Sequence, residues 1–264
     1  MVSQRLRRPL AGRASPFTSG DAMTTSADTA DPIAPQSLPA RMMGVLTSPG
    51  DTFRRLAAHP RWLGVLVVVT LVPAVLWFWF LTTDSGQTAF LDQQVRQMES
   101  FGQTVTDEAY EGLERSLSFI PYVVGGSTLV FGPILTLIAA GILFAVFNAG
   151  LGGDATFKQV FSIVAHAGVV PLVQAVFTIP LNLVRESMTS PTNLFVFFPM
   201  LEEGSAVARF LGMIDLFLIW WIVVLAIGLA VLYRRRTTPI VIGLMTTYVS
   251  IALVAALVMS AMSS

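Results

Sequence analysis

Long apolar runs, separated by polar segments, dominate the chain. Five runs of 19 to 26 residues lie at 63–81, 122–147, 161–184, 210–233 and 239–262. A helix of 19 residues is about 28 Å long, close to the thickness of the hydrocarbon core of a bilayer. Lipid offers no hydrogen-bond partners, and the runs lack the period-two alternation of a membrane β-barrel. The pattern predicts an all-α integral membrane protein, a bundle of five transmembrane helices.

Shorter stretches are amphipathic, and we expect them to form interfacial helices. Within an interfacial segment at 41–61, residues 48–58 place apolar side chains beside Arg54 and Arg55. A helix on the inner leaflet is expected there, and a solvated turn is the alternative. Loop 82–121 predicts two amphipathic helices, and Thr106 is the expected N-cap of the second. The two helices either rest on the outer leaflet or cap the bundle, or they form a binding lid. Residues 191–201 are too short to span and form a re-entrant or surface segment.

Composition narrows the class of protein. Hydrophobic residues make up 54% of the 264 residues and charged residues 12%, with a net charge of zero and no cysteine. Soluble domains carry about 25% charged residues, so an ordinary cytosolic enzyme and a nucleic-acid binder are excluded. Without cysteine there is no disulfide or thiolate metal site. Residues 1–40, rich in Ser, Thr, Ala, Pro and Arg, predict a disordered cytoplasmic tail before a membrane domain at 62–264.

The basic residues predict an orientation. Residues 1–61 hold eight arginines, and alternate segments along the chain sum to 12 Lys and Arg on one side against 4 on the other. Cytoplasmic loops carry the basic excess. We therefore expect a cytoplasmic N-terminus and an external C-terminus, in a bacterial inner membrane.

Three stretches resemble a known family. VLTSPGDTFRRLAAHPRW (45–62), GGDATFKQVFSIVAHAGVVPLV (152–173) and DLFLIWWIVVLAIGLA (215–230) are similar to the membrane domain of the Yip (Ypt-interacting protein) family. The resemblance covers roughly 45–262 and implies five membrane helices, a cytoplasmic N-terminus and no accepted catalytic residues. In eukaryotes it implies vesicle traffic and contact with small GTPases. The bacterial-looking tail and loops depart from that context, so that function is not carried over.

The ionisable and amide residues inside the predicted transmembrane helices that are candidates for function are His166, Gln174, Asn182 and Asp215. Polar groups are costly in lipid, so each is a candidate functional residue. Counting from the helix ends places Asp215 about 7.5 Å below the outer face, at a depth that suits Gln174 rather than His166. We expect a Gln174–Asp215 hydrogen bond worth about 0.6–2 kcal/mol. The alternative is an Asp215 that reaches the outer interface or is protonated locally.

His166 could be a proton relay or a ligand. A metal site needs three or four ligands, and the other histidine, His59, precedes the first predicted helix. A histidine that packs between helices is therefore favoured, and no cofactor, metal or catalytic residue is expected. Ser127 and His166 lie near opposite ends of their helices, so they form no Ser–His pair.

Two further groups of residues are candidates for contacts with partners. Ala252, Ala256 and Ser260 recur every four residues, a spacing that lets another helix of the bundle or of another subunit approach closely. Basic side chains beside the membrane suit lipid headgroups or an acidic partner, namely Arg54, Arg55, Arg234, Arg235 and Arg236.

The expected function is organisational. A non-enzymatic membrane protein of this kind contacts the lipid bilayer and binds another membrane protein or itself, with no nucleic acid. The alternative is a small transporter or an accessory subunit of one. Prolines inside the helices, at Pro73, Pro133, Pro171 and Pro180, fit either structural kinks or the broken helices of a transport path.

Overall fold

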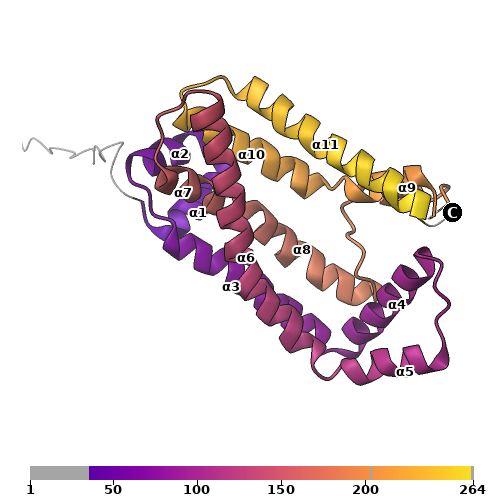
Figure 1. The fold of residues 1–264 in the computed structure, drawn as a ribbon. Coiled ribbons are helices and arrows are strands. Elements are labelled where there is room, and N and C mark those ends of the chain that lie inside the picture. Colours follow the sequence, from indigo (N-terminus) through magenta and orange to yellow (C-terminus); the bar gives the residue numbers. More distant parts are fainter. Residues whose placement is uncertain (1–35, 203, 263–264) are drawn as a thin grey trace, which may run out of the picture. The chain divides into compact units, whose positions relative to one another are not determined.

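The computed structural model describes residues 36–202 and 204–262, so residues 1–35 of the tail expected at 1–40 lie outside the described residues. The described part is helical (Figure 1). In chain order its elements are α1 (Leu38–Thr47), α2 (Pro49–Ala58), α3 (Leu63–Leu81), α4 (Asp84–Ser100), α5 (Asp107–Ser116), α6 (Ile120–Phe144), the π-helix η1 (Ala145–Gly150), α7 (Phe157–Ala167), α8 (Val169–Arg185), the 3₁₀ helix η2 (Leu194–Phe197), α9 (Ala206–Met213), α10 (Leu216–Leu232) and α11 (Thr237–Met262).

Within the described residues, four helical segments are long and apolar enough to cross a bilayer: Leu63–Leu81, Ile120–Gly150, Phe157–Arg185 and Thr237–Met262. The chain is thus a multi-pass membrane protein. The predicted run at 161–184 corresponds to α7 and α8, which meet at Gly168. The predicted run at 210–233 is not one helix, because α9 and α10 are separate and α10 has only 17 residues. At about 1.5 Å per residue α10 is roughly 25 Å long, somewhat shorter than the hydrocarbon core.

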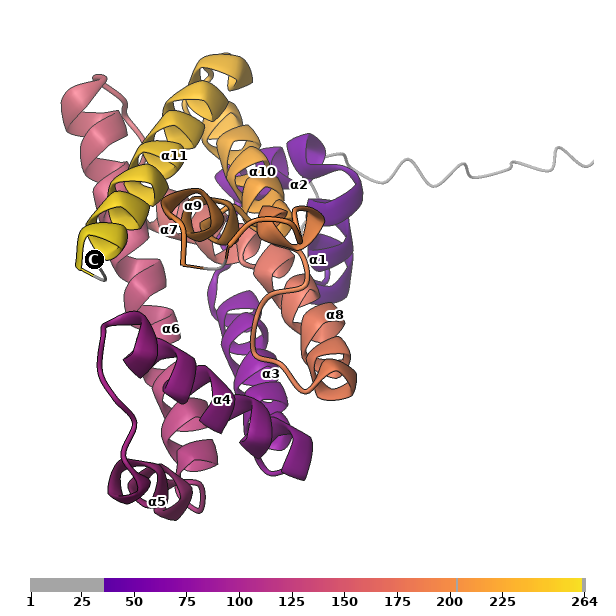
Figure 2. The same ribbon diagram turned by 90° about the vertical axis from the view of Figure 1, so that its right-hand side faces the viewer.

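The helices α3 and α6 pack side by side along much of their length (Figures 1 and 2). The ring of Phe78 in α3 meets that of Tyr122 at the start of α6 edge to face, with centroids 5.2 Å apart. Away from α3, the side chains of α6 are uncovered: Phe131, Leu135 and Ile138 are 58, 62 and 51% exposed. In water such a surface would be unfavourable, whereas lipid tails cover it at no cost.

The apolar side of the short helix α2 packs against protein. Its apolar residues Phe53 and Leu56 are 0 and 2% exposed and belong to a core with residues of α7 and α10. Figure 2 shows α2 beside α10. The apolar edge predicted for residues 48–58 is present, and it faces α7 and α10. Ser48 is the N-cap residue of α2, although its side chain makes no capping hydrogen bond.

The helix α1 precedes α2 and corrects the boundary of the expected tail. It begins at Leu38, so residues 38–40 are helical rather than disordered. Val45 of α1 is fully buried, in the same core as α2.

The loop at 82–121 forms two helices, as predicted. Thr106 caps α5 by accepting a hydrogen bond from the backbone N–H of Ala109. In α4, Phe90 and Leu91 are each 8% exposed and pack with Phe80 and Ile179, so α4 covers the end of α3 and α8. None of the residues of α5 is buried. The structure therefore favours a cover over the bundle for α4.

Gly228 permits the contact between α10, α2 and α7. A Cβ placed on Gly228 would lie 2.5 Å from a methyl group of Ile163 and 3.3 Å from the ring of Phe53. Gly228→Ala should therefore reduce the free energy of unfolding by about 1–3 kcal/mol, because overpacking forces the neighbouring side chains to move. This loss should appear as a lower melting temperature in mild detergent.

Gly243→Ala is the matched control, since Gly243 is also inside a helix and a Cβ there meets nothing within 4 Å. Alanine is the better helix former, so this variant should be neutral or slightly stabilising. Equal melting temperatures for the two variants would contradict the close packing at Gly228.

Candidate functional site

The predicted helix over 210–233 is interrupted near its start. Ile214 is extended (φ −91°, ψ 105°), and Asp215 is the N-cap of α10. The carboxylate of Asp215 accepts a hydrogen bond from the backbone N–H of Phe217 at 2.8 Å. This bond satisfies one of the N–H groups that a helix leaves free at its N-terminus, and aspartate is among the best residues for that role.

Three side chains also donate to the same carboxylate. Nε2 of Gln174, in α8, lies 3.1 Å from Oδ1 of Asp215. The hydroxyls of Ser190 and Thr192 donate to Oδ2 at 2.6 and 2.7 Å. Asp215 is 9% exposed. Two carboxylate oxygens offer about four acceptor positions, so the four donors use them fully.

The backbone at the interruption is also satisfied. The N–H of Leu194 donates to the carbonyl of Ile214 at 2.8 Å, and the N–H of Leu216 donates to the carbonyl of Thr192 at 3.1 Å. The N–H of Asp215 donates to the Tyr248 hydroxyl at 3.2 Å, which donates to the carbonyl of Met213 at 2.5 Å. Asp215, Gln174, Ser190, Thr192 and Tyr248 are called the Asp215 cluster below.

Tyr248, a member of the Asp215 cluster, lies near the middle of α11. Tyr248 is about 16 Å from the first residue of α11 and about 21 Å from its last. The estimate of 7.5 Å assumed an unbroken helix from residue 210, whereas the chain is extended at Ile214. The structure nevertheless brings Gln174 and Asp215 together and keeps His166 apart. The segment after α8 folds back to reach Asp215, and Asn193 is only 3% exposed.

A cavity adjoins the Asp215 cluster. It has a volume of about 390 Å³ and lies between α3, α8 and the segment that follows α8. Its polar lining consists of Gln174, Thr178, Asn182 and Ser190, among apolar side chains. Asn182 is 3% exposed, and its Oδ1 has no hydrogen-bond partner among the described residues. A neutral polar group on a small ligand could be bound there, and no charged side chain lines the cavity.

His166 is isolated from this cluster. It is fully buried in α7, and its Nδ1 donates to the carbonyl of Ser162 at 2.7 Å. Its Nε2 and the Ser162 hydroxyl have no partner in the described part of the chain. Across the same residues, no three of the possible His, Cys, Asp or Glu ligands gather into a metal site.

The small residues of α11 pack inside the chain. Ala252 and Ala256 are 4 and 1% exposed, Ser260 is half-buried, and α11 contacts α9 and α10. The sequence allowed this face to pack within the bundle or against another subunit, and in the structure it packs within the bundle.

The basic candidates lie outside the helical core. Arg54 pairs with Asp51, and Arg55 lines a hollow near α1. Arg234 has a positive φ of 52°, and Arg235 donates to the carbonyl of Leu151 at 3.1 Å. Arg236 is exposed.

Comparison with known families decides what kind of protein carries these features. The family model of the Yip1 domain matches residues 43–259. The chain belongs to the Yip1 family. No curated protein and no solved structure was found to match it. The Yip1 domain extends from α1 into α11 and includes the whole Asp215 cluster.

Sequence reasoning about this Yip1 domain missed three members of the cluster: Ser190, Thr192 and Tyr248. The first two lie in a segment whose fold-back depends on tertiary packing. The capping role of Asp215 had a local signal, an aspartate directly before an apolar helical run.

Asp215→Leu should be far more damaging than Gln174→Leu. Leucine at 215 leaves several buried donors without an acceptor, at a cost of about 3 kcal/mol or more, whereas Gln174→Leu removes one bond worth about 1 kcal/mol. Thermal unfolding in mild detergent measures both. The prediction is wrong if the two variants melt at the same temperature, and Asp215→Asn, which keeps a capping oxygen, should fall between them.

Proposed function

We propose that this Yip1-family protein is a non-enzymatic factor that binds and organises other membrane components. The observation that carries this proposal is the full occupancy of Asp215, the carboxylate buried beside the cavity, by four neutral donors. A carboxylate that holds a helix break together has no acceptor position left for a substrate proton. That arrangement supports a structural role for the Asp215 carboxylate.

A groove between α3 and α6 offers a place for a partner helix. It has a volume of about 220 Å³ and is lined on α6 by Tyr122, Gly125, Gly126 and Leu129. A Cβ on Gly126 would meet nothing within 4 Å, so this glycine leaves room for an approaching backbone. Small residues are common where membrane helices associate. We therefore place the partner contact on this groove.

A photo-crosslinking residue at Leu129 is expected to give one defined protein adduct in native membranes. The same residue at Ile251, an exposed position of α11, is the control and should give lipid adducts alone. Gly126→Leu, which fills the groove, should remove the adduct from Leu129 while the melting temperature changes little. Adducts that are equal at both positions would contradict a specific partner.

A small transporter, or an accessory subunit of one, is the second candidate, and the polar cavity beside Asn182 favours it. Alternating access would make that cavity reachable from each side of the membrane in turn. Since the chain has no cysteine, Thr178→Cys provides a single probe in the lining. Modification from both sides by an impermeant thiol reagent would favour transport over organisation.

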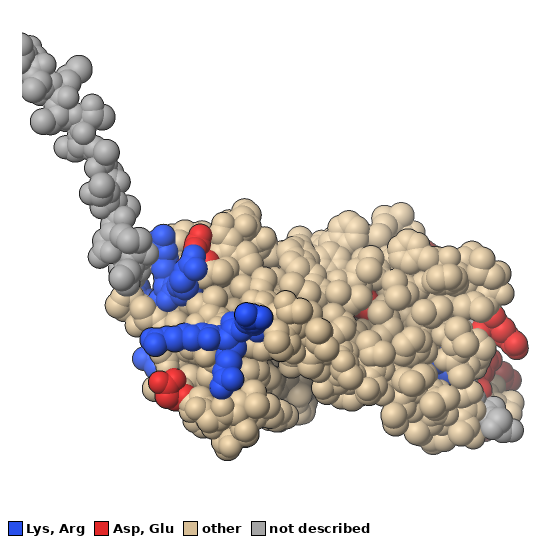
Figure 3. All heavy atoms as spheres, turned by 90° about the horizontal axis from the view of Figure 1, so that it is seen from above, with Lys and Arg blue, Asp and Glu red and all other residues tan. Residues whose placement is uncertain are grey.

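We also propose five crossings, with the N-terminus in the cytoplasm and the C-terminus outside, in an inner membrane. Figure 3 shows basic side chains gathered at one end of the molecule and acidic ones mainly at the other. Such an asymmetry is typical of a cytoplasmic face at the basic end. Because α11 packs along both α9 and α10, these two helices together match its length and support a fifth, broken crossing.

Single cysteines test this topology directly. Gly112→Cys and Gly204→Cys should react with an impermeant maleimide from outside intact cells, and Gly150→Cys and Arg236→Cys only after permeabilisation. A Cβ at each of the three glycines meets nothing within 4 Å, so these variants should fold normally. If positions 204 and 236 react from the same side, α10 does not cross and the fifth crossing is lost.

A further inference from the structure

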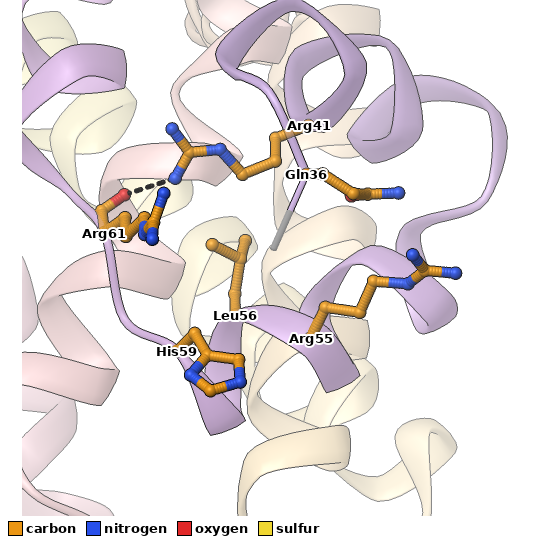
Figure 4. Close-up of a pocket in the computed structure, with 6 residues that line it drawn as sticks. All are labelled: Gln36, Arg41, Arg55, Leu56, His59 and Arg61. Carbon is orange, nitrogen blue, oxygen red and sulfur yellow. Dashed lines mark hydrogen bonds between the residues drawn. The ribbon is translucent and has the colours of Figure 1, made fainter. Parts of the chain in front are cut away.

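A basic hollow lies where α1 and α2 meet the start of α3. It is lined by Gln36, Arg41, Arg55, Leu56, His59 and Arg61. Figure 4 shows Arg41 and Arg61 together on one side and Gln36 and Arg55 on the other, with Leu56 between them. The lining thus holds three guanidinium groups and an imidazole and no carboxylate.

Arg41 is the unusual member of this lining. It is 8% exposed, although charged side chains are rarely buried unless they are paired. Its Nη1 donates to the carbonyl of Arg61 at 3.0 Å, while its Nε is buried without a hydrogen-bond partner among the described residues. Burial lowers the pKa of Arg41, and the neighbouring charge of Arg61 lowers it further. An anion placed between these groups would relieve both effects.

The size and position of the hollow indicate how such an anion would sit. The enclosed space is about 10 Å³, enough for one oxygen-sized atom, and Arg61 and His59 are exposed at its mouth. Arg61 stands two residues before Leu63, where the first membrane-spanning segment begins, next to Trp62. Trp side chains favour the headgroup layer of a bilayer. We therefore expect the hollow to lie at the level of the lipid phosphates.

We propose that this hollow binds a phosphate group, with one oxygen directed toward Arg41 and another toward Arg61. Guanidinium groups match phosphate oxygens in geometry and charge, and they do so without a metal. The phosphate belongs either to an anionic phospholipid or to a soluble phosphate compound. The inference is independent of the proposed function, because it concerns one ligand and requires no protein partner.

The test compares two double variants that remove the same charge from the same end of the protein. Arg55→Gln with Arg61→Gln alters the hollow but keeps the carbonyl of residue 61 that anchors Arg41. Arg54→Gln with Arg236→Gln alters exposed arginines outside it. Phosphatidylglycerol is titrated onto each full-length protein in uncharged detergent, and retained lipid is measured by native mass spectrometry. The first variant should bind about fivefold more weakly or worse than wild type, and the second within about twofold.

A parallel titration with inorganic phosphate, read as a rise in melting temperature, distinguishes the source of the phosphate. Stabilisation by phosphatidylglycerol alone assigns a lipid headgroup, and stabilisation by inorganic phosphate that is lost in the first variant assigns a soluble ligand. Equal weakening in both double variants would overturn the proposal, because it would reduce the effect to general surface charge. So would a lack of response to both ligands in a wild-type protein that melts cooperatively.

Discussion

If α9 and α10 form the proposed fifth crossing, the break between them must have every backbone hydrogen bond completed inside the protein. In a hydrocarbon layer an unpaired N–H or carbonyl costs several kcal/mol, so a helix can be interrupted there only if other groups replace its lost bonds. Here the replacements come from the segment at 190–194 and from Tyr248 of α11. One interruption thereby holds α8, the segment that follows it, α10 and α11 in one arrangement.

At the break between α9 and α10, an aspartate satisfies the surrounding donors better than an asparagine would. A carboxylate only accepts hydrogen bonds, and four donors converge on Asp215: a backbone N–H, an amide and two hydroxyls. An asparagine would turn an NH₂ group toward some of these donors. The free N–H groups at the start of α10 also carry partial positive charge, which favours an anion at that position. The cost of burying the carboxylate is thus offset by polar groups that themselves need acceptors.

The limits of sequence reasoning follow from the same physics. The run at 63–81 coincides with α3 because length and hydropathy alone determine such a helix. The interruption at Ile214 escaped this reasoning, since hydropathy averages over a single aspartate within a long apolar run. The pairing of Gln174 with Asp215 was accessible from depth along the helices, but Ser190, Thr192 and Tyr248 reach the site through tertiary packing. The apolar edge of α2 likewise predicts a buried face, but the sequence alone does not distinguish lipid from protein as the partner of that face.

Charge is handled differently in the two polar regions of this Yip1 domain. In the Asp215 cluster every acceptor position of the anion is filled by the chain itself. Around Arg41 the described residues bring cationic groups together without a carboxylate in the lining, and a buried Nε remains unpaired. Burying an unpaired charge is unfavourable. The cationic groups around Arg41 therefore need a counter-charge, and the surroundings of the protein must supply it. We expect the headgroup layer beside Trp62 to do so, whereas Asp215 already has four donors from the chain itself.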